Sequence, residues 1–288
     1  MMAGDAVTAR PLSARERSAA RALLRRDAGA NLLLLDLIDH LGEAPPPAEP
    51  PPVLVGLWRR RELAGVGALR PCVVLSEGID PACLAVFAPL LEPLGTGLVK
   101  TAEGAGAVVA RALADLGRHI VVDRHERVLA RPCARRGGAL PDPAAGARVR
   151  PARRDDHPAL VEAARASLRE EGRPDPFGVD PEGFRRWVAG RMERATVVEE
   201  DGRVAFVAYA DVRRPEGWLL QGVYTWPEYR RRGLARIGVG ALCRSAADAG
   251  ADHVQLTVVE GNVAAEGLYA GLGFAPVGRV RTLLFASD

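Results

Sequence analysis

The stretch GVYTWPEYRRRGLA, residues 222–235, is the part of this sequence from which the fold can be inferred. An apolar strand is expected to end here, and the pattern Arg-x-x-Gly-x-Ala, residues 230–235, is expected to open a helix after a proline-containing turn. The first turn of a helix has unpaired N–H groups and the positive end of the helix dipole, so it favours anions. Gly233 and Ala235 leave room for a phosphate beside the backbone. The segment contains Arg230, Arg231 and Arg232, and Arg236 directly follows it, so the helix start carries positive charge. The pattern indicates a pyrophosphate site; the alternative is a plain helix start with solvated arginines.

A second segment, NVAAEGLYAGLGF at residues 262–274, favours the pyrophosphate interpretation. It directly follows an expected strand, residues 253–259, just as the first segment follows its own strand. Asn262 can cap a helix, Tyr269 lies next to the apolar face of that helix, and Gly273 suits the position after a helix C-terminus. An amphipathic helix with a half-buried tyrosine would also explain this segment alone. The two segments in this order are more specific than either one.

Together the two segments resemble the signatures of the GCN5-related N-acetyltransferases (GNAT). The acyl-CoA signature [Gln/Arg]-x-x-Gly-x-[Gly/Ala] is matched at Arg230, Gly233 and Ala235. The later signature N-x-x-A-x-x-L-Y-x-x-x-G-F is matched over residues 262–274. The resemblance covers residues 147–286, and the whole chain is also similar to bacterial tandem GNAT proteins whose N-terminal half is degenerate.

The resemblance implies a co-substrate, acetyl-CoA, and a set of contacts to it. The pantetheine arm would pair with backbone groups of the strand end, which belong to Val223, Tyr224 and Thr225. The pyrophosphate would be held by backbone amides of the helix start, which belong to Arg231, Arg232, Gly233, Leu234, Ala235 and Arg236. Asn262 would lie beside the pantetheine, and Tyr269 would protonate the leaving thiolate as general acid.

The implied reaction is direct attack of a neutral primary amine on the acetyl carbonyl. It requires a general base or a water chain, and a strand amide near Val223 would stabilise the oxyanion. Some relatives carry a glutamate early in this strand, where residues 218–221 here read WLLQ. The carboxylates of Asp211, Glu216 and Glu260 are expected in turns or facing solvent, so the base stays unassigned. The alternatives are a non-catalytic acyl-CoA-binding or regulatory protein, and an enzyme that transfers a longer acyl group.

Length and composition are those of a folded protein of about two domains: 288 residues, of which 48% are hydrophobic and 26% charged. Residues 134–146 are expected to link a degenerate GNAT-like domain, residues 1–133, to a catalytic domain, residues 147–288. Both halves show the element order of an α/β fold of the α+β type, in which a mixed central sheet is flanked by helices. The first half lacks the acyl-CoA signature at a strand end, so we expect it to bind no acyl-CoA.

Other classes of protein fit less well. A formal charge of +3 is too small to indicate nucleic-acid binding by bulk electrostatics. No apolar run reaches the ~18 residues of a membrane span, the start has no apolar signal core, and the four cysteines form no C-x-x-C pair, so we expect a cytoplasmic protein. No metal site is predicted, because the histidines lie on separate elements. The expected partners are acetyl-CoA and an amine acceptor, either a small molecule or a protein amine. The sequence specifies neither the acceptor nor the oligomeric state.

Overall fold

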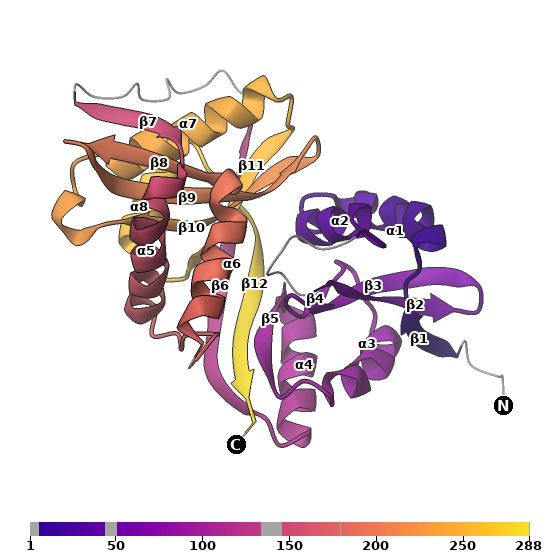
Figure 1. Cartoon of the computed structure of the whole chain (residues 1–288). Coiled ribbons are helices and arrows are strands. Elements are labelled where there is room, and N and C mark those ends of the chain that lie inside the picture. The colour runs from indigo at the N-terminus through magenta and orange to yellow at the C-terminus, as the bar shows by residue number, and fades with distance from the viewer. Residues whose placement is uncertain (1–5, 44–50, 134–145, 179, 288) are drawn as a thin grey trace. The chain divides into compact units, whose positions relative to one another are not determined.

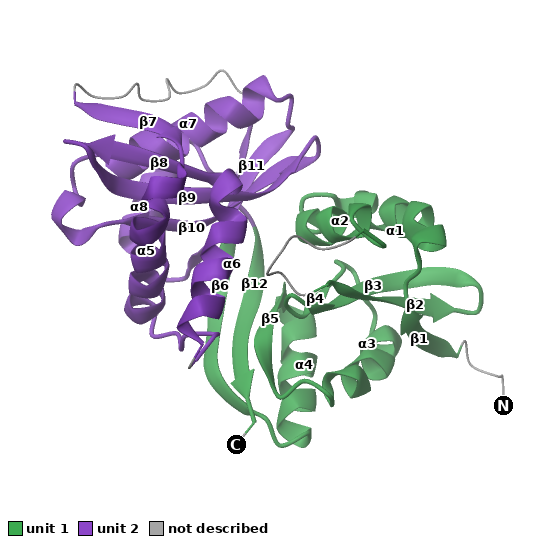
Figure 2. Cartoon of the chain, in the orientation of Figure 1, with its two compact units in different colours: residues 1–45, 50–128, 278–288 green, residues 46–49, 129–277 purple. Residues whose placement is uncertain are grey.

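The computed structural model describes residues 6–43, 51–133, 146–178 and 180–287 (Figure 1). These residues form two compact units (Figure 2). Unit 1 contains the described residues up to 128 and those from 278 onward, and unit 2 contains those from 129 to 277. Most of the predicted linker, at positions 134–145, lies outside the described residues.

Unit 1 follows the order β-α-α-β-β-β-α-β-α-β. Its strands are β1 (Val7–Pro11), β2 (Val53–Arg59), β3 (Glu62–Arg70), β4 (Val74–Leu75), β5 (Thr96–Ala102) and β6 (His119–Pro132), and its helices are α1 (Arg17–Leu24), α2 (Leu32–Asp39), α3 (Pro81–Phe87) and α4 (Glu103–Asp115). Strands β1 to β4 form an antiparallel sheet. Successive residues of β2 enter different apolar clusters: Leu54 packs with α1 and α2, and Val55 with α3 and α4. Helices therefore cover both faces of this sheet, because side chains alternate along a strand.

The second half of the chain, from residue 146 onward, repeats the same order. Its strands are β7 (Ala147–Pro151), β8 (Ala195–Glu200), β9 (Arg203–Arg214), β10 (Gly217–Thr225), β11 (His253–Val259) and β12 (Ala275–Ala286), and its helices are α5 (His157–Glu170), α6 (Pro181–Arg191), α7 (Leu234–Asp248) and α8 (Val263–Gly271). The strand order is β11-β10-β9-β8-β7, with β10 parallel to β11 and the other neighbours antiparallel. Along β9, Phe206 packs in the cluster of α7 and Val207 in that of α5 and α6. Helix α7 therefore covers one face of the sheet, and α5 and α6 cover the other (Figure 1). The predicted mixed α/β class, with a central sheet and flanking helices repeated in tandem, is confirmed.

The last residues of the chain belong to unit 1, although they directly follow unit 2 in the sequence. Strand β12 is one continuous strand, and β6 is one strand of 14 residues. Strand β12 pairs antiparallel with β5, from Val280 opposite Ala102 to Ala286 opposite Thr96. Leu283 and Phe285 are buried in the apolar cluster of α3 and α4, so packing assigns residues from 278 onward to unit 1. The boundaries 1–133, 134–146 and 147–288 stay a prediction about the sequence.

Candidate functional site

Strands β10 and β11 separate soon after they begin to pair. Their parallel register contains only Trp218 with Val254 and Leu219 with Gln255, and both strands lie wholly within the described residues. On its other edge, β10 stays paired with β9 as far as Thr225. The edge of β10 that faces β11 therefore has no ladder partner beyond Leu219. An edge of this kind can accept an added extended chain through main-chain hydrogen bonds.

A bulge interrupts β10 within this unpaired part. The register with β9 shifts between Gln221 and Tyr224, and Gly222 has a φ of +56°, a left-handed value that favours glycine. One consequence is visible in the packing. Leu220 and Val223 contact the same apolar cluster although they are three residues apart, whereas a regular strand would place them on opposite faces. The extra residue thus changes the direction of the backbone groups at Gly222 and Val223.

The chain next reaches the N-terminus of α7 through a short loop. Arg231 and Gly233 both have positive φ values, +64° and +80°, and Gly233 is the N-cap residue. No side chain among the described residues caps this helix, and a Cβ placed on Gly233 would meet nothing within 4 Å. The first N–H groups of a 15-residue helix are consequently left beside open space. This arrangement suits a phosphate or another anion.

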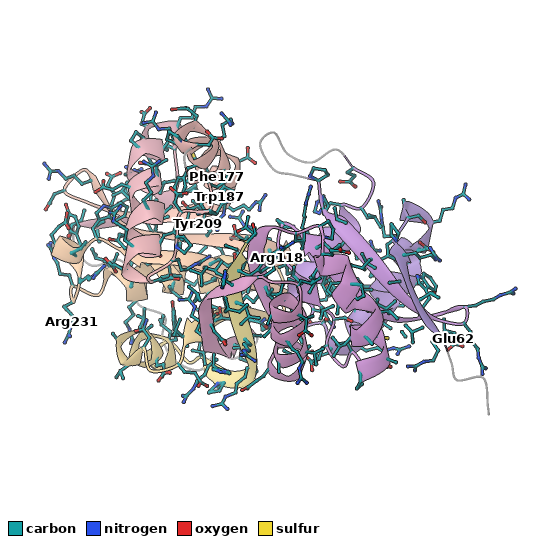
Figure 3. All side chains as sticks on the ribbon, turned by 90° about the horizontal axis from the view of Figure 1, so that it is seen from below. Glu62, Arg118, Phe177, Trp187, Tyr209 and Arg231 are labelled. Carbon is teal, nitrogen blue, oxygen red and sulfur yellow. The ribbon has the colours of Figure 1, made fainter. Side chains whose placement is uncertain are left out.

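The arginines around this helix start have different surroundings. Arg231 is exposed and extends away from the ribbon (Figure 3). Arg232 pairs with Glu200 of β8, with Nη1 3.0 Å from Oε2. Arg236 extends over α8, where a Cβ on Gly271 would lie 2.8 Å from its Nη1. The positive charge expected from the sequence is thus partly balanced by a carboxylate within the protein.

Helix α8 presents the residues of the second signature. Asn262 is its N-cap, and its Oδ1 accepts a hydrogen bond from the amide of Ala265 at 3.1 Å, which confirms the predicted cap. Tyr269 is 6% exposed, packs edge-on against Phe274, and shares one apolar cluster with Val223. Burial raises the pKa of the Tyr269 phenol, so the hydroxyl stays protonated at neutral pH. Within the described residues, no hydrogen bond restrains this hydroxyl.

The carboxylates near β10 in sequence are held in ion pairs. Asp211 accepts hydrogen bonds from both Nε and Nη2 of Arg191, and the two side chains are 11% and 12% exposed. Glu216 lies in the predicted turn but contacts Nε of Arg214 at 3.2 Å, with little exposure. Glu216 thus lies in a turn, as expected. Asp211 lies within β9 and pairs with Arg191 with little exposure, so the expectation of a turn or solvent-facing position is wrong for Asp211.

An aromatic row lies on the face of the sheet covered by α5 and α6. The rings of Phe177 and Trp187 have their centroids 5.9 Å apart, and the guanidinium of Arg191 lies 4.8 Å from the ring of Trp187 and 4.3 Å from that of Tyr209. The three labelled rings follow one another in Figure 3. Burial raises the pKa of Tyr209 to about 12. A Cβ on Gly222 would lie 2.9 Å from this tyrosine ring, so the row ends at the bulge.

One acidic residue of the site has no signal in the sequence. Glu170, the last residue of α5, contacts Arg230 and the hydroxyl of Tyr224, which are 60 and 54 residues away along the chain. Sequence spacing carries no information about such a contact, because only the packing of α5 on β10 creates it.

The corresponding helix of unit 1 begins differently. Its α3 has Asp80 as N-cap and Pro81 in the first turn, and the Asp80 carboxylate accepts a hydrogen bond from the amide of Cys83 at 2.9 Å. This bond, together with the Arg59 guanidinium, lowers the pKa of Asp80. The protein's own carboxylate thus occupies the place at which α7 offers free amides.

Neither a metal centre nor a membrane-spanning helix is found in the described part of the chain. No group of three or more His, Cys, Asp or Glu residues there is arranged to hold a metal ion. No helix there is both long and apolar enough to cross a membrane.

Comparison with known proteins agrees with this geometry. Residues 158–274 match the sequence model of the acetyltransferase (GNAT) family. The second half of the chain therefore matches the GNAT family model, and the whole chain has the tandem GNAT fold, as the resemblance implied. A comparison with curated protein sequences gives no match.

Three solved structures illustrate the fold. A Drosophila protein is 15% identical, with a TM-score of 0.74 and coverage of 98% of this chain and 99% of its own. A tandem GNAT protein from the clavulanic acid biosynthesis pathway is 16% identical, with a TM-score of 0.60 and coverage of 96% and 98%. A GCN5-related N-acetyltransferase from Sphaerobacter thermophilus is 16% identical, with a TM-score of 0.61 and coverage of 97% and 95%. At these identities the likeness concerns the fold alone.

Proposed function

We propose that this protein is an acetyl-CoA-dependent N-acetyltransferase that moves an acetyl group to a primary amine, with the reaction carried by unit 2. One observation supports the proposal most: the unpaired edge of β10 leads directly to the uncapped N-terminus of α7. Acetyl-CoA needs both features, because its pantetheine arm carries amide groups and its pyrophosphate carries negative charge.

The pantetheine arm would occupy the gap between β10 and β11. Backbone groups of Val223, Tyr224 and Thr225 belong to the part of β10 that pairs with β9 but not with β11. The arm would satisfy these groups as an added strand does. Asn262, whose side chain caps α8, would border the arm on the opposite side.

The pyrophosphate would bind at the start of α7. The amides available are those of residues 231–236, and the positive φ values of Arg231 and Gly233 set the direction of the loop. Gly233 contributes by its lack of a side chain, since nothing lies within 4 Å of the position of a Cβ. The nearby guanidinium groups would add a favourable field.

The chemistry would proceed by direct transfer. The nitrogen of a neutral amine attacks the acetyl carbonyl, the carbon–sulfur bond breaks, and Tyr269 gives its proton to the leaving thiolate. The raised pKa of Tyr269 keeps this proton in place at neutral pH. A backbone amide at the bulge, near Val223, would stabilise the oxyanion. The proton of the acceptor amine would leave through water, because Asp211 and Glu216 are engaged with arginines.

The second candidate is a non-catalytic acyl-CoA-binding or regulatory protein. Residues 218–221 contain no carboxylate, and the ion pairs of Asp211 and Glu216 favour this alternative. Replacement of Tyr269 by Phe separates the two candidates. An enzyme is expected to lose turnover by about 100-fold while it keeps its acetyl-CoA affinity, whereas unchanged turnover contradicts the acid role.

Calorimetric titration with acetyl-CoA tests the cofactor site itself. We expect one equivalent per chain, and no binding to an Arg232→Glu, Gly233→Asp double variant, which places two carboxylates at the helix start. Unit 1 is expected to contribute no second equivalent, because Asp80 already caps α3. Absence of binding by the wild-type protein would contradict the proposal.

A further inference from the structure

The loop between β10 and α7, residues 226–233, is called the phosphate loop here. The side chain of Arg230 in this loop makes several contacts within the protein. Its Nε donates to the carbonyl oxygen of Thr225 at 3.0 Å, and its Nη2 contacts both carboxylate oxygens of Glu170, at 2.7 and 2.8 Å. The guanidinium also lies 5.6 Å from the ring centroid of Tyr224. Arg230 is the first residue of the acyl-CoA signature. Its side chain thus connects the phosphate loop to the end of the preceding strand and to α5.

Glu170 makes a second contact with the same strand. The hydroxyl of Tyr224 donates to Oε1 of Glu170 at 3.2 Å. Burial is the main cause that raises the pKa of this phenol, and the negative charge of Glu170 raises it further. One carboxylate at the end of α5 therefore holds two side chains, one on β10 and one on the loop that follows it. We call Glu170, Tyr224 and Arg230 the α5 latch.

We propose that Glu170 is a positioning residue for the acyl donor: through Arg230 it holds the phosphate loop in the conformation that binds the pyrophosphate. This inference rests on the proposed function of the same site. Among the described residues, the Glu170 carboxylate contacts the side chains of Arg230 and Tyr224, so its effect on the loop passes through the arginine. The acyl-CoA signature itself specifies no partner on α5; the contact with Glu170 comes from the packing of α5 on β10.

The local conformation explains why the loop needs such support. Residues 226–233 join a strand end to a helix, and two of them, Arg231 and Gly233, have left-handed φ values. A loop with these values samples other conformations unless contacts select one, and preorganised amides bind an anion more tightly than mobile ones do. The Arg230 side chain ties the middle of this loop to Thr225 and Glu170 at once.

The strength of the latch comes from its connectivity. The side chains of Arg230 and Glu170 are 41% and 46% exposed, and a single ion pair at such exposure contributes little. Here the arginine also binds a backbone carbonyl, and the carboxylate also accepts from a tyrosine, which limits the freedom of both groups.

A competing role predicts the opposite sign. If Arg230 instead leaves Glu170 to bind the pyrophosphate directly, Glu170 is a competitor of the phosphate, and its removal strengthens binding. If Arg230 acts through Glu170, removal weakens binding. The sign of the change in affinity therefore distinguishes the two roles.

The experiment measures the dissociation constant of acetyl-CoA by calorimetry for Glu170→Gln, Arg230→Lys, Tyr224→Phe and the wild type. We expect Glu170→Gln and Arg230→Lys to weaken binding by about three- to tenfold, since each breaks the network, and Tyr224→Phe by about twofold. Lysine keeps the positive charge, but it lacks the planar guanidinium that donates hydrogen bonds to Thr225 and Glu170 at the same time. The matched control is Glu171→Gln, which removes the neighbouring exposed carboxylate and is expected to leave the affinity within about twofold of the wild type.

A second measurement separates positioning from general stability. Hydrogen exchange of the amides of residues 231–236 in the free protein is expected to become faster in Glu170→Gln while the melting temperature stays unchanged. Affinity that is unchanged or stronger in Glu170→Gln overturns the inference while wild-type binding still supports the proposed function. Failure of the wild type to bind acetyl-CoA overturns both.

Discussion

The ring of Tyr209 occupies the space that a side chain on Gly222 would need. A Cβ on Gly222 would lie 2.9 Å from Cδ2 and 3.2 Å from Cε2 of this tyrosine, and 3.8 Å from a guanidinium nitrogen of Arg191. Tyr209 is buried and belongs to the core of the α5 and α6 face, so it has little freedom to move. The bulge of β10 therefore depends on a glycine for two separate reasons, its φ and its contact with this ring.

Replacement of Gly222 by Ala is expected to destabilise the protein by about 2 kcal/mol, since it adds backbone strain to a steric overlap. Acetyl-CoA binding should weaken more than stability alone explains, because the bulge directs the backbone of β10. Urea denaturation and calorimetry measure the two effects. The control is Gly104→Ala in α4, where a Cβ meets nothing within 4 Å and φ is ordinary, and where we expect no loss of stability. Equal behaviour of the two variants would argue against the role of the bulge.

Asp80 is expected to stabilise unit 1 without creating a ligand site. Replacement by Ala removes the cap of α3 and should cost about 1 kcal/mol of unfolding free energy, as cap deletions do. Because the folded-state pKa of Asp80 is lowered, its contribution is present above the ordinary aspartate pKa and is lost as the pH falls. Calorimetry of this variant should still show one equivalent of acetyl-CoA. A second equivalent in the wild type would refute the assignment.

Asp156 should produce a pH-dependent part of the stability of unit 2. Its carboxylate accepts hydrogen bonds from Arg150 at 2.6 and 2.9 Å with 8% exposure, and this contact lowers its pKa in the folded protein. A carboxylate whose pKa is lower in the folded than in the unfolded protein stabilises the folded state at pH values above its unfolded pKa of about 4. This stabilisation disappears as the pH falls through the folded-state pKa.

The free energy of unfolding of the variant Asp156→Asn is therefore expected to be about 3 kcal/mol lower than that of the wild type at pH 7. The reason is that Arg150 keeps a buried charge with one partner fewer. The difference from the wild type should shrink below about pH 4. Denaturant titrations between pH 7 and pH 3 measure it, with the exposed neighbour Asp155→Asn as control. A difference that does not change with pH would contradict the pairing.

The four cysteines are free thiols in two environments. Cys83 and Cys243 are buried, whereas Cys72 and Cys133 are partly exposed. Burial raises the pKa of Cys243 to about 12, and a thiol of this kind forms little thiolate at neutral pH. We expect a thiol reagent to modify at most two cysteines rapidly in the native protein and all four after unfolding. Rapid reaction of Cys243, located by mass spectrometry, would contradict this packing.

The local features of the candidate site could be predicted because they depend on neighbouring residues. The cap at Asn262 and the helix starting near Gly233 both follow from residues within a few positions of one another. The closing strand shows the limit of this reasoning. Its residues predict strand structure, but its pairing with β5 joins positions about 185 residues apart.

The sequence by itself determined the order of elements, the mixed α/β class and the two GNAT signatures, because propensity, caps and apolar periodicity are local properties. Only the tertiary structure decided which groups surround those signatures. It opened β10 from β11 after two pairs, paired β12 with β5, and brought Glu170 to Arg230 across 60 residues. These contacts depend on how whole helices and strands pack, and side-chain packing between distant segments leaves no regular spacing along a single chain.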